Sequence, residues 1–189
     1  AEEAATIFAD PFQEKLADGW HWLRELPEAW RLREGGLEIR AFPGDANSVK
    51  NALRRPAPDR TAGAFAVEVT VSNLTPPTIQ FEQAGITWYV DDKPVFKLVK
   101  ELIDGKTYII PGRKPVENVA VRLRLVIDRD RWIAQYRPAG EKDFLVAAEG
   151  TLPPAKNDQV SLQCYHGPQD SEHWMRFEDF RIVRLDHKP

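Results

Sequence analysis

Side chains that can hydrogen-bond to sugar hydroxyls recur at alternate positions of several apolar segments. In segment 81–101, FEQAGITWYVDDKPVFKLVKE, Ala84, Ile86 and Trp88 share one phase, whereas Gln83 and Tyr89 share the other. Successive side chains of a strand point to opposite faces, so the polar residues are expected to form a row on a surface. Amide, guanidinium and phenol groups bind hydroxyls, and aromatic rings cover the apolar face of a sugar. The ligand-binding set predicted on this basis is Trp22, Arg24, Gln83, Tyr89, Lys97, Arg122, Arg124, Gln163 and Tyr165.

A solvated sheet surface is the alternative interpretation of the same row. An antiparallel sheet with one face in water carries polar residues without any ligand. The aliphatic stems of Arg and Lys also cover sheet surfaces. Both interpretations stay open here, with Trp22, in WHWLRE, as the expected stacking platform of the ligand groove.

Acidic residues near the two ends of the sequence suggest a metal site. Asp10 lies in the first predicted strand, and Glu178 and Asp179 lie in the last. If these strands pair, two or three carboxylates come together, and carboxylate oxygens are ligands for Ca²⁺. We therefore expect a structural Ca²⁺ at these three residues, with ordinary solvated carboxylates as the alternative, since no D-x-D-x-D loop is present.

Known catalytic motifs are absent from the sequence. None of the four histidines has zinc-ligand spacing, and no G-x-S-x-G or phosphate-binding glycine loop occurs. Cys164 lies two residues before His166, but its strand phase places the thiol in the core, where it is inert. We assign no catalytic residue, so the protein is expected not to be an enzyme. An acid or base from Glu82 or Glu101 is the alternative.

Alternating apolar residues between turn signals predict many strands and few helices. The predicted strands are 6–12, 20–24, 30–33, 37–41, 52–55, 64–73, 78–90, 95–103, 106–110, 119–128, 131–137, 144–149, 159–166 and 175–185. Tight hairpin turns are expected at Gly35-Gly36 and Arg129-Asp130, and segments 10–19 and 46–53 show weak helix signals. This pattern predicts an all-β fold in which residues 1–189 form a single antiparallel two-sheet sandwich.

Composition excludes several classes of protein. The net charge is −3 with both signs interspersed, which argues against binding to nucleic acid or to an anionic membrane surface. No apolar run reaches the roughly 18 residues of a membrane span. The start AEEAATIFADPF, without Met, is what cleavage of a signal peptide would leave, so we expect an exported protein, periplasmic or secreted.

Three segments resemble the concanavalin A-like (laminin G-like) sandwich domains attached to family 43 β-xylosidases and related bacterial domains of unassigned function. These are IFADPF…LADGWHWLRELPEAWRLREGGLEIRA, then EQAGITWYVDDKPVFKLVKELIDG, then WMRFEDFRIVRL. The resemblance implies a jelly roll of two antiparallel sheets, one concave, often with a structural Ca²⁺ and often serving sugar recognition beside a catalytic domain. The sequence is too short to contain the catalytic propeller of those xylosidases.

The catalytic E-x-D-x-E signature of laminarinase-type relatives is also absent. Glu178 and Asp179 are adjacent and so point to opposite faces, whereas a retaining glycosidase needs two carboxylates about 5–5.5 Å apart. The resemblance thus implies a bacterial, non-catalytic carbohydrate-binding or accessory domain whose partner is an oligo- or polysaccharide. Two alternatives remain: a small glycoside hydrolase-like enzyme acting on a sugar derivative, and a structural or interaction domain without a small-molecule ligand.

Overall fold

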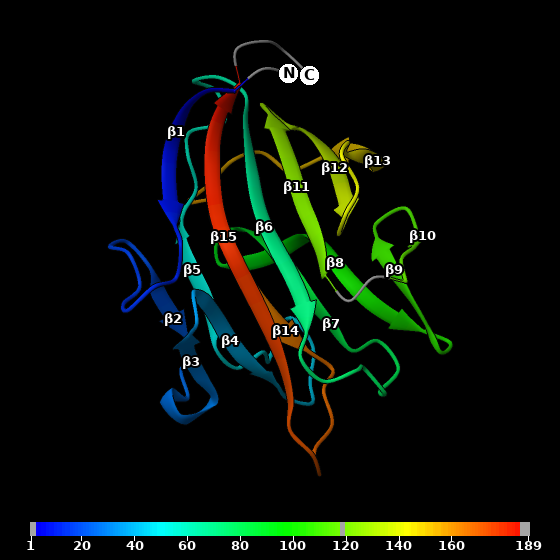
Figure 1. Ribbon diagram of the computed structural model, residues 1–189. Coiled ribbons are helices and arrows are strands. Elements are labelled where there is room, and N and C mark those ends of the chain that lie inside the picture. The colour runs from blue at the N-terminus through cyan, green and yellow to red at the C-terminus, as the bar shows by residue number, and fades with distance from the viewer. Residues whose placement is uncertain (1–2, 118–119, 186–189) are drawn as a thin grey trace.

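The structure is a computed structural model that describes residues 3–117 and 120–185. It consists of two antiparallel sheets packed face to face (Figure 1). Sheet A contains β3 (Trp30–Arg33), β4 (Gly36–Ala41), β15 (His173–Leu185), β6 (Phe65–Asn73), β11 (Ala120–Asp128), β12 (Arg131–Pro138) and β13 (Leu145–Thr151), in that spatial order, with β1 (Glu3–Asp10) also paired to β15. The all-β sandwich predicted from the alternation is therefore confirmed.

Sheet B lies behind sheet A in Figure 1. Its strands, in spatial order, are β10 (Lys114–Pro115), β9 (Lys106–Ile110), β8 (Lys93–Ile103), β7 (Gln83–Val90), β14 (Gln159–Tyr165), β5 (Ala52–Pro56) and β2 (His21–Leu23). Because β9 pairs with residues 99–103 of β8, the earlier part of β8 has no strand on its outer side among the described residues. That free edge borders the candidate site.

The core fills the space between the sheets with the apolar phase of each strand. Trp88 of β7 is fully buried and stacks on Phe65 of β6, with their ring centroids 6.2 Å apart. Gly85 lies where a Cβ atom would meet the carbonyl oxygen of Leu98 on the neighbouring strand β8. The glycine inside this apolar strand is thus explained by the close approach of β7 and β8.

Arg60 lies in the connection between β5 and β6 and binds two other connections at one end of the sandwich. Its guanidinium is 1% exposed and donates to Asp158 (2.7 Å), Asp130 (3.0 Å) and the carbonyl oxygens of Arg129 (3.3 Å) and Pro153 (2.8 Å). The indole nitrogen of Trp88 donates to the same Asp158 carboxylate. A buried charge is tolerated here because charged and carbonyl oxygens satisfy its donors.

Several predicted boundaries are wrong in detail. Residues 78–82 form a loop rather than the start of β7, and Val119 lies outside the described residues. The β3–β4 hairpin turns at Glu34-Gly35, one residue earlier than predicted, because both residues adopt the positive φ that its two-residue turn requires. Neither weak helix signal becomes a helix. The helical element of the described residues is the short 3-10 turn η1 (Pro27–Ala29).

Candidate functional groove on sheet B

Five of the predicted ligand-binding residues lie on the outer face of sheet B. The register aligns Lys97 with Thr87 and Thr87 with Ser161, while Ala84, Ile86 and Trp88 face the core. The five predicted residues on this outer face are Gln83, Tyr89, Lys97, Gln163 and Tyr165. The polar row of segment 81–101 thus extends across three neighbouring strands.

Hydrogen bonds fix most of this row in place. The Tyr89 hydroxyl and the Ser161 hydroxyl both donate to Oε1 of Gln163, at 2.9 and 2.8 Å. Nε2 of Gln163 and Oγ1 of Thr87 are buried and have no hydrogen-bond partner among the described residues. Since buried polar groups are nearly always paired in proteins, these two atoms are candidates for contacts with a ligand or with ordered water.

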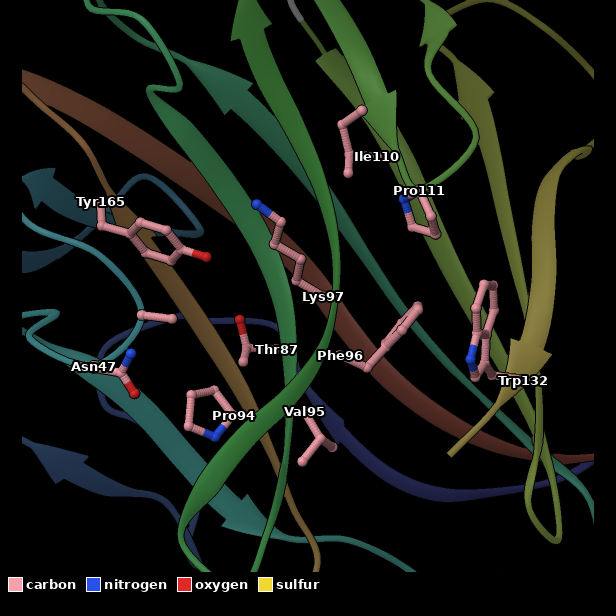
Figure 2. A pocket seen from close by; sticks show the side chains of 11 residues that line it. Asn47, Thr87, Pro94, Val95, Phe96, Lys97, Ile110, Pro111, Trp132 and Tyr165 are labelled. Carbon is pink, nitrogen blue, oxygen red and sulfur yellow. The ribbon is translucent and has the colours of Figure 1, made fainter. Parts of the chain in front are cut away.

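A cavity of about 430 Å³ opens above this row (Figure 2). Thr87, Lys97 and Tyr165 line it from the sheet, and Figure 2 shows the Tyr165 hydroxyl directed toward the Lys97 side chain. The remaining lining residues are Ala46, Asn47, Pro94, Val95, Phe96, Ile110, Pro111 and Trp132. The Phe96 and Trp132 rings, with centroids 4.4 Å apart, form an aromatic wall where the free edge of β8 approaches sheet A.

A second cavity of about 200 Å³ adjoins the first and shares Ala46, Asn47 and Pro94 with it. Its other lining residues are Leu23, Arg24, Arg54, Tyr89 and Asp92. We call the two adjoining cavities the sheet B groove. It extends across the sheet from the end of β2 to the end of β9, a shape suited to a ligand longer than one sugar ring.

The walls of the groove come from two connections. On one side, segment 42–51 folds over the sheet, where Val49 packs against Tyr165. His166 and Gly167 donate their backbone N–H groups to the carbonyl oxygens of Gly44 and Phe42 and so hold that segment. On the other side, the turn after Ile110 packs against β13: a Cβ atom on Gly112, which has φ +99°, would meet the carbonyl oxygen of Ala147. Both walls are therefore anchored to the sandwich.

The phenol groups of the groove are hydrogen-bond donors at neutral pH. Burial raises the pKa of Tyr89, against the opposing effects of its hydrogen bond to Gln163 and the nearby Arg54 and Arg24. Burial also raises the pKa of Tyr165, and the negative charges of Glu101 and Asp45 add to this effect. The Lys97 ammonium donates to Gln83 (2.7 Å) and Glu101 (2.9 Å), so the acidic Glu101 is paired in this state. The groove therefore offers two neutral phenol donors, Tyr89 and Tyr165, and an ammonium donor, Lys97, whose charge is balanced by Glu101.

Arg122 and Arg124 lie on the outer face of sheet A, away from the groove. Glu68 of β6 pairs with both, at 3.2 Å to Nε of Arg122 and 2.6 Å to an amino nitrogen of Arg124. The prediction that these two arginines share a ligand face with Gln83 and Tyr89 is wrong. The alternation of apolar and polar residues predicts which side chains face outward from the core, but not to which of the two sheets their strand belongs.

Trp22 is also misplaced by the prediction. It pairs with the buried Leu53 and packs against the core, and its ring centroid lies 4.7 Å from that of Trp30. The ring is therefore part of the sandwich rather than a stacking platform on the groove. Arg24, the residue after β2, does line the second cavity.

The predicted metal ligands do not come together. β1 pairs with β15 as expected, with Asp10 opposite Phe180. The Asp10 carboxylate is buried and accepts N–H bonds from Phe12 (2.8 Å), Ala17 (2.8 Å) and the Trp20 indole (2.9 Å). Glu178 and Asp179 form ion pairs with neighbouring arginines of the sheet. Within residues 3–117 and 120–185, no three His, Cys, Asp or Glu side chains are placed to hold a metal ion.

The remaining titratable candidates lie inside the structure. Cys164 is buried, its thiol lies 3.7 Å from the carbonyl oxygen of Ile39, and burial raises its pKa far above the ordinary range. Glu82 and His173 form a buried pair, with His173 Nδ1 2.8 Å from a carboxylate oxygen, outside the groove lining. The burial of the Cys164 thiol expected from its strand phase is therefore confirmed.

Sequence reasoning missed the groove walls. Asn47, Pro111 and Trp132 come from connections or from sheet A, and their positions depend on how those segments fold over sheet B. The turn-rich stretch FPGDANS at 42–48 was one available signal, because a long polar connection between strands commonly borders a binding surface. No comparable signal marked Trp132, which resembles any other core residue of its strand.

Searches against protein families and curated proteins found no match. Solved structures do match this fold. The GH43 BlXynB protein from Bacillus licheniformis is 20% identical, with a TM-score of 0.72 over 94% of this chain and 39% of that one. The xylan beta-1,4-xylosidase from Bacillus halodurans is 17% identical, with a TM-score of 0.72 over 97% of this chain and 40% of that one.

Another match covers nearly the whole of the matched protein. The CBM2 module of the evolved Dit protein of Lactobacillus casei BL23 phage J-1 is 9% identical, with a TM-score of 0.64 over 98% of this chain and 99% of that one. This chain thus has the sandwich fold predicted from the resemblance, and its structural neighbours include modules of carbohydrate-active proteins. It spans about two fifths of each of the two Bacillus proteins, so the likeness concerns one part of each.

Proposed function

We propose that this protein is a non-catalytic carbohydrate-binding or accessory domain whose ligand, an oligo- or polysaccharide, occupies the sheet B groove. The observation that carries this proposal is the 430 Å³ cavity, whose lining combines the aromatic wall of Phe96 and Trp132 with Thr87, a residue whose hydroxyl has no partner among the described residues. A sugar ring offers an apolar face and hydroxyl groups together, and such a cavity complements both. In the same proposal the protein acts outside the cytoplasm, where such polymers are encountered.

Thr87 gives a direct test because its hydroxyl has no hydrogen-bond partner within residues 3–117 and 120–185. Thr87→Val keeps the shape of the side chain and removes the hydroxyl, so stability should be unchanged or slightly increased. Asn47→Ala is a second variant, since the exposed Asn47 lines both cavities. The same Thr→Val change at Thr70, on the outer face of sheet A and outside the groove, is the control for affinity; its hydroxyl accepts a hydrogen bond from Arg122 (3.1 Å), so its stability is not compared.

The experiment is calorimetric titration with neutral oligosaccharides from xylan, arabinan and β-glucan and with acidic ones from galacturonan, alginate and glucuronoxylan. Products are checked by mass. Binding that weakens about fivefold or more in Thr87→Val and Asn47→Ala, but not in Thr70→Val, would support the proposal, since one hydrogen bond contributes about 1 kcal/mol. An affinity that is unchanged in both Thr87→Val and Asn47→Ala would place the ligand outside the groove. Turnover would instead indicate an enzyme, with Glu101 as the first carboxylate to examine.

A further inference from the structure

The second cavity of the groove carries an excess of positive charge. Two guanidinium groups, those of Arg24 and Arg54, line it together with the Tyr89 ring, and Asp92 is the acidic residue among its lining residues. The Asp92 side chain is 81% exposed, so it stands at the rim rather than inside the cavity. In the first cavity, by contrast, the ammonium of Lys97 is paired with Glu101.

Arg54 is held in position and yet incompletely paired. The residue is 8% exposed and its guanidinium carbon lies 5.0 Å from the centre of the Tyr89 ring. One amino nitrogen donates to Asp92 at 3.2 Å, while the buried Nε has no hydrogen-bond partner among the described residues. A buried guanidinium with an unpaired N–H and a single, solvent-exposed partner is costly unless a further acceptor completes it.

Arg24 approaches the same cavity from the end of β2. Its Nε donates to the carbonyl oxygen of Val49 at 2.7 Å, which fixes the plane of the guanidinium. Its backbone adopts φ 53°, in the left-handed region that a residue with a side chain rarely adopts. The carbonyl oxygen of Arg24 accepts an N–H bond from Asn51 (3.1 Å), which holds the chain in this conformation after β2. Both guanidinium groups interact electrostatically with Tyr89, and each of these interactions acts to lower the pKa of the Tyr89 hydroxyl.

We propose that the cavity between Arg24 and Arg54 binds the carboxylate of an acidic sugar, so that the natural ligand is a uronate-containing oligosaccharide. Planar guanidinium groups bind carboxylates through two parallel hydrogen bonds, which a neutral hydroxyl cannot reproduce. The adjoining first cavity then holds the neighbouring sugar ring. This inference rests on the proposed function, because it identifies the class of ligand for the same groove.

Asp92 has a defined part in this arrangement. Its carboxylate contacts Arg54 from the rim, where the ligand carboxylate would compete with it for the same guanidinium. Asp92 is exposed while Arg54 is buried, so in the exchange Asp92 is released to water and the ligand carboxylate takes its place as the partner of Arg54. Asp92→Asn should therefore strengthen the binding of an acidic oligosaccharide, whereas a purely structural ion pair would predict no gain.

The test compares tetrasaccharides from galacturonan, alginate and glucuronoxylan with the same molecules after reduction of their carboxyl groups, and with sulfated chondroitin oligosaccharides. Calorimetry is run on the parent protein, Arg24→Met, Arg54→Met and Asp92→Asn. Arg137→Met, on sheet A, is the control. We expect at least one carboxylated ligand to bind tenfold or more tightly than its reduced form. Arg54→Met should abolish this preference, Arg24→Met should weaken it, and added salt should reduce it.

The outcomes separate this inference from the proposed function. Equal binding of carboxylated and reduced forms, still dependent on Thr87 and Asn47, would overturn the inference and leave the function intact. Binding of the sulfated oligosaccharides alone would also overturn the carboxylate assignment. If no saccharide binds, both proposals fail. Circular dichroism of each arginine variant, together with retained binding of reduced ligands, excludes a loss caused by misfolding.

Discussion

Replacing Arg60 by Met should produce a large loss of stability, because the guanidinium makes four hydrogen bonds to two other connections while almost completely buried. Methionine fills much of the same volume but supplies no donor. Breaking a buried ion pair by removing one partner costs about 3–5 kcal/mol. The Asp158 carboxylate keeps N–H bonds from the Trp88 indole (3.0 Å) and the backbone of Lys156 (3.0 Å), so the lower end of that range applies. We expect a decrease of about 3 kcal/mol in the free energy of unfolding.

The assay is urea unfolding at pH 7 followed by tryptophan fluorescence, with Arg60→Met, Asp158→Asn and the double variant. The two substitutions should be coupled by about 1–3 kcal/mol, because each of them removes the same Arg60–Asp158 ion pair. Lys156→Met is the control: its ion pair with Asp91 is exposed, and it should contribute less than about 1 kcal/mol. A loss below about 1 kcal/mol for Arg60→Met, or additive effects, would refute the reasoning.

Three further predictions concern other parts of the sandwich. Burial lowers the pKa of Lys100 from 10.5 to about 8, and the unfolded state therefore binds the proton more tightly. Stability should thus rise between pH 8 and 10.5 by about 1–3 kcal/mol relative to Lys100→Met in urea titrations, and parallel profiles would contradict this. Cys164 should react with a thiol reagent only as fast as the protein unfolds; faster labelling would show that the thiol is accessible. Gly112→Ala should cost at least about 1 kcal/mol, because φ is positive and the new Cβ would meet the Ala147 carbonyl oxygen. It should also weaken saccharide binding by displacing the wall at Pro111, and unchanged melting and affinity would disprove the contact.

Strand alternation predicted the sandwich well because most strands are long and have one buried face. In β11, Val121, Leu123 and Leu125 face the core, and the two arginines between them, Arg122 and Arg124, face outward, as the sequence indicated. Short strands carry too little pattern for the same inference. β2 has three residues, so the orientation of Trp22 was determined by its pairing with Leu53, a contact between segments far apart in sequence.

The polar row of the candidate site could be predicted from the sequence, whereas the walls of the groove could not. The phase of β7, β8 and β14 placed Gln83, Lys97 and Tyr165 outside the core, and hydrogen-bonded pairing then brought them onto one face. The phase of Arg122 was equally correct, yet its strand belongs to the other sheet. Which sheet receives a strand depends on long-range pairing. The sequence pattern of a single strand does not contain that information.

The topology also bears on how the chain is made. In sheet A, β15 lies between β6 and the strands β4 and β1, and in sheet B, β14 lies between β7 and β5. Both of these inner strands come from residues 159–185. During synthesis from the N-terminus, sheet B therefore exists as two separate parts, and β1, the β3–β4 hairpin and the β6–β13 strands of sheet A stay apart, until this segment emerges from the ribosome. Pairings between residues distant in sequence are slow to form, and the separate parts meanwhile expose unpaired strand edges. A nascent chain of this protein would thus depend on protection of those edges until β15 is available.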